Sequence, residues 1–145
     1  MRVISLIIVT VMLCLSYNTQ AQIKRYSKWE QAVKKAKTDK KDILIVLTGK
    51  QWCAPCKVLE KNILSSQTFE DYAQKHLVIF EIDIPKSHLL KKNSKIVKLH
   101  EEFSARYQTP EFPSLILVDT EGNKIVDITE SEWTLNEVMP ILRAQ

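Results

Sequence analysis

Glycine is scarce in this sequence, since Gly49 and Gly122 are the only two among 145 residues. Nucleotide-binding loops need several closely spaced glycines, so this shortage argues against them. The segment Thr48-Gly49-Lys50 contains a Gly-Lys pair but lacks the earlier glycine of a phosphate-binding P-loop. The sequence therefore gives no support for a protein that binds nucleotides through such a loop.

Cysteine is also rare, with three residues in the chain. Small secreted proteins that depend on disulfides for their stability carry more, so the chain does not fit that class. Its length suits one domain with a core of its own, and 45% hydrophobic with 26% charged residues does not fit a disordered chain. The odd number of cysteines needs a separate explanation.

The N-terminal segment has the pattern of a secretory signal peptide. Arg2 precedes an apolar run over residues 3–15, and the small residue Ala21 follows a short polar stretch. The run is shorter than the roughly 20 apolar residues of a membrane-spanning helix. We predict that residues 1–21 are a signal peptide cleaved after Ala21, and that the protein is periplasmic or secreted. An uncleaved N-terminal anchor is the alternative.

The same segment accounts for the odd cysteine. Cys14 lies within the apolar run, and Leu13 before it is not the small residue that precedes the modified cysteine of a bacterial lipoprotein. We therefore expect no lipid attachment. Without residues 1–21 the chain keeps two cysteines, Cys53 and Cys56, which stand in one motif.

Residues 22–145 contain no internal repeat, low-complexity segment or proline-rich linker, which indicates a single domain. Patterns typical of helices and of buried strands alternate along it. In order, we predict a helix capped by Ser27-x-x-Glu30, a strand over Ile43–Leu47, a helix after the cysteines, a short helix from near Thr68, a strand over Leu77–Ile84, a helix over Ile96–Tyr107, strands over Ser114–Val118 and Lys124–Thr129, and a helix capped by Thr134-x-x-Glu137.

This order predicts the α/β class. Apolar strands that alternate with helices pair in parallel at the centre of a sheet, and the last two strands form an antiparallel hairpin. A mixed sheet flanked by helices follows. Pro140 is expected to kink or shorten the last helix, and the Pro85–Lys95 loop is a candidate for partner choice.

Cys53 and Cys56 stand where a predicted strand passes into a helix. Free backbone N–H groups and the helix dipole at a helix N-terminus favour the thiolate of Cys53, and the thiolate is the attacking species. Cys56, one turn along and more buried, can attack the resulting mixed disulfide and release the substrate. Pro55 is tolerated because its missing N–H would have no partner there. The position therefore favours a redox-active pair.

Three other interpretations of this pair stay open. It could be half of a zinc site, although zinc needs two further ligands and the three histidines lack ligand spacing: His76, His88 and His100. It could be a permanent structural disulfide of an exported protein. It could also be a reduced, inert pair in the core. We expect no metal and no cofactor.

The chain resembles the thioredoxin superfamily and, within it, exported bacterial thioredoxin-like proteins. The resemblance rests on Trp52-Cys53-Ala54-Pro55-Cys56-Lys57 after an apolar strand and on Phe112-Pro113-Ser114 before another. Leu47–Cys53 and Phe69–Pro85 add to it, and it covers nearly all of residues 27–145. It implies the thioredoxin fold, with a central mixed sheet flanked by helices, and a thiol–disulfide oxidoreductase.

The resemblance also implies roles around the cysteines. Cys53 would be the nucleophile and Cys56 the resolving thiol. Pro113 would be a cis-proline facing them, and Phe112 would offer its backbone groups to an extended substrate segment. An ordinary proline at the start of a strand is the alternative for Pro113, and Pro110 is a rival for the cis position.

Three neighbours of the cysteines would tune their redox properties: Ala54, Pro55 and Lys57. An exposed helix lysine without such a role is the more frequent case for Lys57. Trp52 would either pack in the core or form an apolar lip that binds substrates.

One departure from thioredoxins concerns a buried ion pair. Thioredoxins bury an aspartate on the strand before the motif and pair it with a lysine on the neighbouring strand. The corresponding positions here hold Leu47 and Ile79, so both charges are absent together and no lone charge is buried. The usual proton acceptor for Cys56 is then missing, and water or another group has to take its proton.

Lysines form two clusters in a chain of net charge +4: Lys34, Lys35, Lys37, Lys40 and Lys41, and Lys86, Lys91, Lys92, Lys95 and Lys98. Solvated surface is the default interpretation, and an acidic partner or a membrane surface is the alternative. No motif for reading nucleic acid accompanies them. We expect a monomer that does not bind nucleic acid.

The leading hypothesis is therefore a thiol–disulfide oxidoreductase that acts as a reductase or isomerase rather than as an oxidase. Its partners would be exported proteins that carry disulfides or thiols, and a membrane or periplasmic redox partner would keep it reduced. The second hypothesis is not enzymatic. In it, the fold is a binding module for an exported partner, and Cys53 and Cys56 form a structural disulfide.

Overall fold

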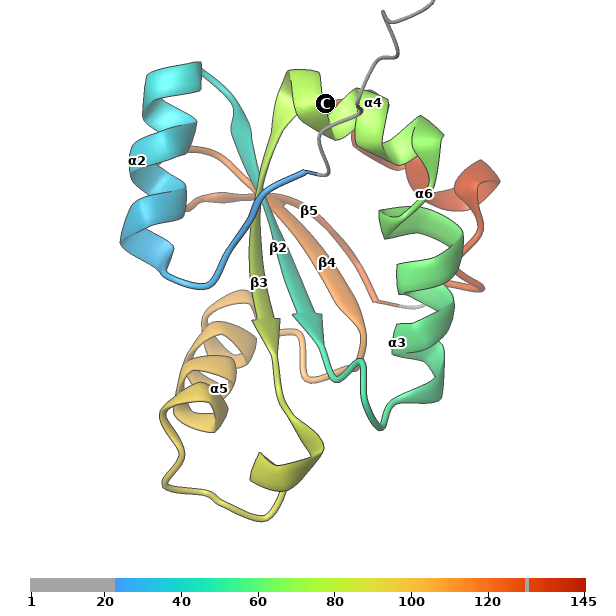
Figure 1. Ribbon diagram of the computed structural model, residues 1–145. Helices are drawn as coiled ribbons and strands as arrows, with labels where there is room; N and C mark the ends of the chain where they lie inside the picture. Colours follow the sequence, from blue (N-terminus) through green and yellow to red (C-terminus); the bar gives the residue numbers. More distant parts are fainter. Residues whose placement is uncertain (1–22, 130) are drawn as a thin grey trace, which may run out of the picture.

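A computed structural model describes residues 23–129 and 131–145. The predicted signal peptide, with Cys14, lies outside these residues. The described chain forms a five-stranded mixed sheet with helices on both faces (Figure 1). Its strand order is β1-β3-β2-β4-β5. The predicted α/β class, with a mixed sheet flanked by helices, is confirmed.

Twelve elements follow one another along the described chain: β1 (Arg25–Tyr26), α2 (Trp29–Asp39), β2 (Asp42–Thr48), α3 (Ala54–Leu59), η1 (Glu60–Leu64), α4 (Gln67–His76), β3 (Leu77–Asp83), η2 (Lys86–His88), α5 (Lys95–Tyr107), β4 (Ser114–Val118), β5 (Lys124–Ile128) and α6 (Leu135–Arg143). The central strand β2 pairs in parallel with β3 and antiparallel with β4. At the edges β1 pairs in parallel with β3, and β5 antiparallel with β4.

The sheet is covered by two layers of helices. α3, η1, α4 and α6 pack on one face, and α2 and α5 on the other (Figure 1). Because successive side chains of a strand point to opposite faces, β2 supplies both cores. Leu44 and Val46 join the first, while Ile43, Ile45 and Leu47 join the second. Burial on both faces explains why this strand is a continuous apolar run.

The start of α2 differs from the prediction. The residue that precedes its first turn is Lys28, whose side chain makes no capping hydrogen bond. The predicted capping box of Ser27 and Glu30 is therefore wrong, because Ser27 lies one residue too early for it. The predicted box at Thr134 is confirmed, since the Glu137 carboxylate accepts the backbone N–H of Thr134 at 3.1 Å.

Two further details concern the length of helices. α3 does not end at Leu59 but continues as a π-helical turn, η1, in which the Ser65 N–H reaches the Glu60 carbonyl. α6 continues for three residues beyond Pro140, to Arg143. Its buried face explains this continuation, since Val138, Met139 and Leu142 all lie in the core.

The two positions compared with the buried ion pair of thioredoxins do not face each other. Leu47 and Ile79 are both buried, but they belong to the cores on opposite faces of the sheet. The register pairs Leu47 with Ile82, and Ile79 with Leu44. The expectation that Leu47 and Ile79 replace one ion pair is therefore wrong, because side chains alternate between faces along each strand.

Candidate active site

The cysteine motif begins directly after β2, in a tight turn held by backbone hydrogen bonds. The N–H groups of Trp52 and Cys53 both donate to the Gly49 carbonyl, at 3.0 and 2.9 Å. A Cβ atom at position 49 would overlap the indole ring of Trp52. Glycine is therefore required here by close packing, and the turn places Cys53 at the start of α3.

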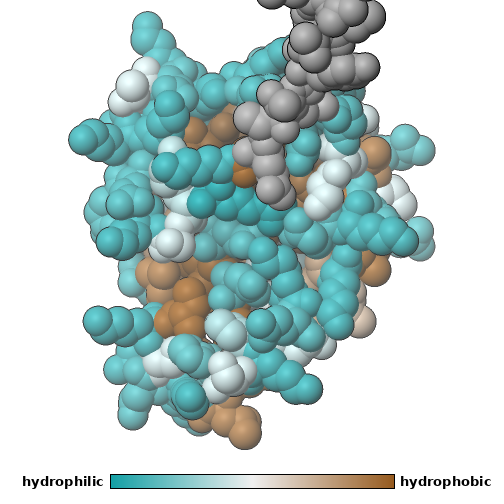
Figure 2. Space-filling view, viewed as in Figure 1, coloured by the Kyte–Doolittle hydropathy of each residue, from teal (hydrophilic) through white to brown (hydrophobic). Residues whose placement is uncertain are grey.

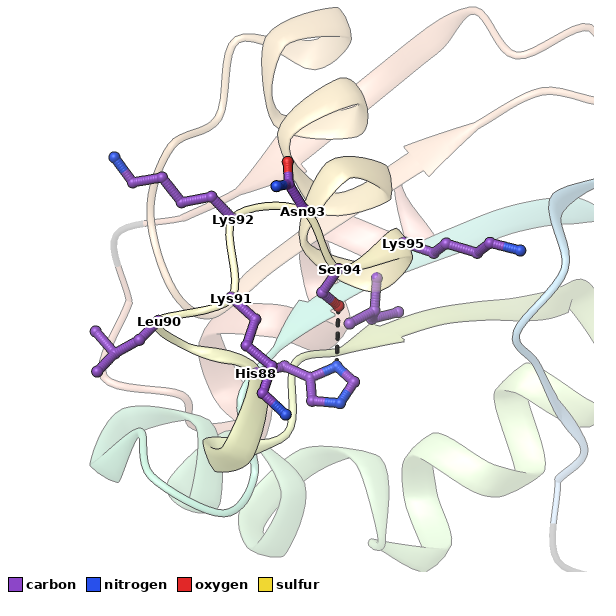
Figure 3. A pocket seen from close by; sticks show the side chains of 8 residues that line it. His88, Leu90, Lys91, Lys92, Asn93, Ser94 and Lys95 are labelled. Carbon is purple, nitrogen blue, oxygen red and sulfur yellow. Dashed lines mark hydrogen bonds between the residues drawn. The ribbon is translucent and has the colours of Figure 1, made fainter.

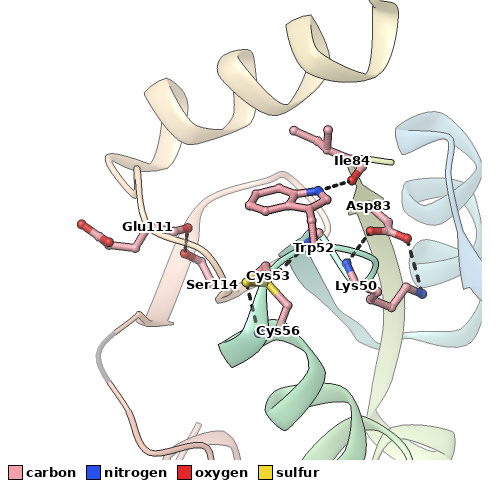
Figure 4. Close-up of a disulfide and its surroundings, with 9 residues drawn as sticks. Lys50, Trp52, Cys53, Cys56, Asp83, Ile84, Glu111 and Ser114 are labelled. Atoms are coloured by element: carbon pink, nitrogen blue, oxygen red, sulfur yellow. Dashed lines mark hydrogen bonds and ion pairs between the residues drawn. A yellow bond between two sulfur atoms is a disulfide. The ribbon is translucent and has the colours of Figure 1, made fainter. Parts of the chain in front are cut away.

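Cys53 and Cys56 are joined by a disulfide, with their Cα atoms 5.2 Å apart (Figure 4). Cys53 is the N-cap residue of α3, and its Sγ accepts the backbone N–H of Cys56 at 3.1 Å. The Sγ of Cys56 accepts the Gly49 N–H at 3.4 Å. Cys53 is 7% exposed and Cys56 fully buried. Of the two sulfurs, that of Cys53 is therefore the one a substrate can approach.

The residues around Pro55 lie on the outer side of the same turn. Ala54, Pro55 and Lys57 are all exposed, and Pro55 stands in the first turn of α3 as predicted. Lys57 has no carboxylate within ion-pair distance in the described part of the chain. The three side chains are therefore open to solvent next to Cys53 in the sequence.

The segment before β4 lies next to this turn. Ser114 pairs with Leu47, so the residues before Ser114 lie beside the end of β2 that leads to the cysteines. The peptide bond between Phe112 and Pro113 is cis. The Ser114 hydroxyl donates to the Glu111 carbonyl at 2.7 Å and accepts from the Thr109 hydroxyl at 2.8 Å. These two bonds fix the loop that carries Phe112 and Pro113, and Figure 4 shows the one between Ser114 and Glu111.

Aromatic rings connect the two segments. Trp52 and Phe112 meet edge to face with their ring centroids 5.3 Å apart, and the Trp52 indole N–H donates to the Ile84 carbonyl at 2.7 Å. Trp52 and Phe112 are both only partly buried. The structure thus brings together Trp52, Phe112 and the cysteine turn.

His100 is a site neighbour that the sequence did not indicate. Its ring stacks on that of Phe112, with the centroids 4.2 Å apart and the planes 8° from parallel. Nδ1 lies 3.4 Å from the Ser104 hydroxyl, and Nε2 is buried without a hydrogen-bond partner among the described residues. Burial lowers the pKa of His100, against a smaller opposing effect of the Glu101 charge. The imidazole that supports Phe112 is therefore neutral at pH 7.

The sequence also did not indicate a network of charged side chains on the other side of the turn. Arg25 of β1 donates to the carboxylates of Glu60 at 2.7 Å and Glu81 at 2.6 Å. Lys50, in the cysteine turn, reaches Glu81 at 2.7 Å, and its backbone N–H donates to Asp83 at 2.9 Å. The network therefore ties the turn to β1, η1 and β3.

The network also sets the charge state of its members. Burial opposes ionisation of Arg25 and Glu60. The hydrogen bonds and charge attraction that they share with each other and with Glu81, Ser65 and Lys50 are stronger in sum. The pKa of Arg25 is consequently raised and that of Glu60 lowered. Both side chains are charged over the physiological pH range.

Neither metal-binding nor membrane-spanning features accompany this site. Within residues 23–129 and 131–145, no group of three or more His, Cys, Asp or Glu side chains is placed to hold a metal ion. Over the same residues, no helix combines the length and apolar character needed to cross a bilayer.

Residues 29–144 match the family of thioredoxin-like domains. The chain belongs to this family. Disulfide bond reductase DsbH of Chlamydia pneumoniae is 29% identical over 101 residues, which are 70% of this chain and 60% of that protein. The chain therefore spans about 60% of the length of this relative.

Solved structures agree with the family assignment. A DsbH oxidoreductase has a TM-score of 0.70 at 27% identity, over 86% of this chain and 85% of that chain. A thioredoxin from Thermus thermophilus has a TM-score of 0.64 at 14% identity, over 85% and 86% of the two chains, and shows the fold alone. The predicted thioredoxin fold is confirmed, and Cys53 and Cys56 form the cysteine pair of this thioredoxin-like domain.

Proposed function

We propose that this thioredoxin-like protein is a thiol–disulfide oxidoreductase that reduces disulfides of exported proteins, in the periplasm or outside the cell. The observation that carries the proposal is that the two cysteines differ in position and burial. Cys53 lies at the N-cap of α3, where its Sγ accepts an N–H, while Cys56 is fully buried behind it. An N–H donor and the helix N-terminus stabilise a thiolate at Cys53.

The reaction begins with the reduced protein. The Cys53 thiolate attacks one sulfur of a substrate disulfide, forming a mixed disulfide, and the other substrate sulfur leaves as a thiolate that takes a proton from solvent. The Cys56 thiol loses its proton and attacks the Sγ of Cys53. The disulfide between Cys53 and Cys56 closes, and the second substrate thiol is released. Two electrons have then passed from the protein to the substrate.

The substrate binds to the apolar side chains of Trp52 and Phe112 beside Cys53. Trp52 and Phe112 contact each other and are only partly buried, so they can pack against a substrate segment. The backbone at Phe112 and Pro113 pairs with that segment in extended form, which gives affinity with little demand on its sequence. Ala54, Pro55 and Lys57 line the approach and tune the pair. The protein acts as a monomer without metal or cofactor.

The reducing direction has two supports. Pro55 between the cysteines resembles the reducing members of the superfamily, and the Chlamydia relative is named a disulfide bond reductase. The protein must regain electrons after each cycle, so a thiol-bearing redox partner in the membrane or periplasm reopens the disulfide. Residues 1–21, proposed as a cleaved signal peptide, would export this protein to the compartment of such a partner.

Trapping in the native host tests the activity. In the Cys56→Ser variant the mixed disulfide at Cys53 cannot be resolved, so substrates stay attached and can be identified after purification. The matched Cys53→Ser variant should trap none. Absence of adducts in both, together with no fast-alkylating thiol after mild reduction, would establish the alternative binding module with a structural disulfide.

The direction is tested separately by equilibrating the protein with glutathione and measuring the reduction potential of the cysteine pair. A reductase is expected near the thioredoxin value of about −270 mV. A potential above roughly −150 mV would identify an oxidant and contradict the reducing direction.

A further inference from the structure

The connection from β3 to α5 and the first turns of α5 carry an unusual concentration of positive charge. Between Ile84 and His100 the sequence contains five lysines and no acidic residue: Lys86, Lys91, Lys92, Lys95 and Lys98. All five are exposed. We call this segment, residues 84–100, the lysine segment.

These lysines contrast with the lysines of the chain that lie close to a carboxylate. Lys35, Lys50 and Lys124 each lie within 4 Å of a carboxylate, at 3.0, 2.7 and 3.4 Å. None of the lysines of the lysine segment forms an ion pair with a described residue. Their charge is therefore not neutralised within the described part of the molecule and is available to a partner.

An exposed apolar side chain stands among the charges. Leu90 is 96% exposed and Leu89 is 39% exposed. Leu90 and Lys92 project from the loop on one side, while Lys95 points in the opposite direction (Figure 3). Below them, residues 88 and 90–96 line an open hollow of about 950 Å³. Figure 2 shows apolar surface at the lower end of the molecule, where Figure 1 places this loop.

The lysine segment is attached to the cysteine turn. Its first residue, Ile84, accepts the indole N–H of Trp52 at 2.7 Å, and the backbone N–H of Lys86 donates to the side chain of Gln51 at 3.1 Å. The loop itself is closed by a hydrogen bond of 2.9 Å between His88 and Ser94. The start of the lysine segment therefore lies beside the cysteine turn, so an extended partner that binds the segment can also reach Trp52.

We propose that the lysine segment binds an acidic stretch of the substrate polypeptide and that Leu90 packs against an apolar side chain of the same stretch. The proposal rests on the proposed function, because the bound polypeptide also presents its disulfide to Cys53. Unpaired positive charge attracts carboxylates and speeds encounter, while contact with Leu90 adds apolar burial. The substrates are accordingly proteins whose disulfides are flanked by acidic residues and at least one apolar residue.

An anionic membrane surface shares the attraction to lysines. The attachment of the segment to Gln51 and Trp52 favours the polypeptide, because a peptide in extended form can contact the lysines and the cysteine turn together. Binding to a membrane surface in place of an acidic polypeptide would therefore contradict the proposal.

The test compares two synthetic peptides that share one intramolecular disulfide and one leucine. Glutamates flank the disulfide in the first peptide and lysines in the second. Each rate is divided by the rate on hydroxyethyl disulfide, which is small and uncharged, so that a general loss of activity cancels. At low salt we expect kcat/KM for the glutamate peptide to exceed that for the lysine peptide by about tenfold or more.

Two variants then assign the preference to its residues. In K91E/K92E the tenfold preference should disappear, whereas K34E/K75E, with the same change in net charge on exposed residues elsewhere, should keep it. Lys75 lies near the first residue of β2, which is the end of the strand away from the cysteines. Leu90→Ser should lower normalised kcat/KM for the glutamate peptide by up to about tenfold.

The outcomes separate the two proposals. No reduction of hydroxyethyl disulfide or of either peptide would overturn the proposed oxidoreductase itself. Reduction of both peptides at equal normalised rates, or equal effects of the two double variants, would overturn only the role of the lysine segment. Binding to phosphatidylglycerol vesicles that K91E/K92E abolishes, without a peptide preference, would assign the segment to a membrane surface instead.

Discussion

Gly49 lies where β2 passes into the cysteine turn, directly against the indole of Trp52. A Cβ at this position overlaps the ring, so Gly49→Ala must displace Trp52 or the turn. We expect a loss of about 1–3 kcal/mol in the free energy of unfolding, measured by urea denaturation. Because the Gly49 N–H also bonds to Cys56, the rate of disulfide reduction should fall as well.

Gly122→Ala is the matched control. Gly122 has a φ of +86°, so alanine there costs about 1–2 kcal/mol in backbone strain, but its Cβ would meet only ordinary contacts at 3.6 Å. It should lower stability without changing the rate of disulfide reduction. Equal effects on the rate from both variants would contradict the role given to Gly49.

His100 offers a second test at the scale of one residue. Its pKa is lowered in the folded protein by burial, so the unfolded chain binds the proton more tightly. The contribution of the neutral His100 to the free energy of unfolding should therefore be fully present above about pH 6.5, the ordinary histidine pKa. It should be lost as the pH falls below that value. In His100→Phe, which keeps a ring against Phe112, the free energy of unfolding should change less between pH 7 and pH 5.

The exposed His76 provides the comparison. His76→Phe should keep the pH dependence of the original protein, with the free energy of unfolding measured by urea titration at each pH. If His100→Phe and the original protein lose stability in parallel as the pH falls, burial of His100 is not the cause.

Arg25 joins three elements of the fold. From β1 it contacts Glu60 at the start of η1, which continues α3, and Glu81 of β3. Glu60→Gln removes one charge from this half-buried network and leaves Arg25 with weaker acceptors. We expect a loss of about 1–2 kcal/mol in the free energy of unfolding at pH 7. The pKa of Glu60 is lowered in the folded protein, so the deficit should shrink as the pH falls below about 4.5, the ordinary value.

Glu102→Gln is the control for this network. Glu102 pairs with Arg106 on the surface of α5, where the two side chains are 55% and 45% exposed. Such exposed pairs contribute about 0.5 kcal/mol or less, so this variant should unfold almost as the original protein does. A Glu60→Gln variant that matches it would show that the network does not hold the elements together.

These elements also show what the sequence could and could not indicate. β2 could be predicted because a strand buried on both faces is a continuous apolar run in the sequence. The cysteine turn could be predicted because the motif stands where that run passes into a helical pattern. β1 has two residues, too few for a pattern, and it forms only by pairing with β3. The contacts of Arg25 with Glu60 and Glu81 join residues 35 and 56 positions apart. No local spacing records such contacts, nor the stacking of His100 on Phe112.

For the whole molecule, the disulfide and the fold are thermodynamically linked. The reduction potential of the cysteine pair differs between the folded protein and an unfolded segment. This difference, expressed as a free energy, equals the difference between the free energies of unfolding of the oxidised and the reduced protein. About 30 mV corresponds to about 1.4 kcal/mol for this two-electron couple. Cys56 and Leu59 of α3 are both fully buried, and such surroundings suit an uncharged disulfide.

We therefore expect the oxidised protein to have the larger free energy of unfolding, as a reductase requires. Urea denaturation with and without reductant measures the difference directly. The Cys53→Ser/Cys56→Ser double variant is the control, since reductant should leave its unfolding unchanged. A more stable reduced form would contradict the reducing direction, because stabilisation of the reduced state is what makes a thioredoxin-fold protein a strong oxidant. The sign of this stability difference thus shows whether the potential of the cysteine pair lies below or above that of an unfolded dithiol segment.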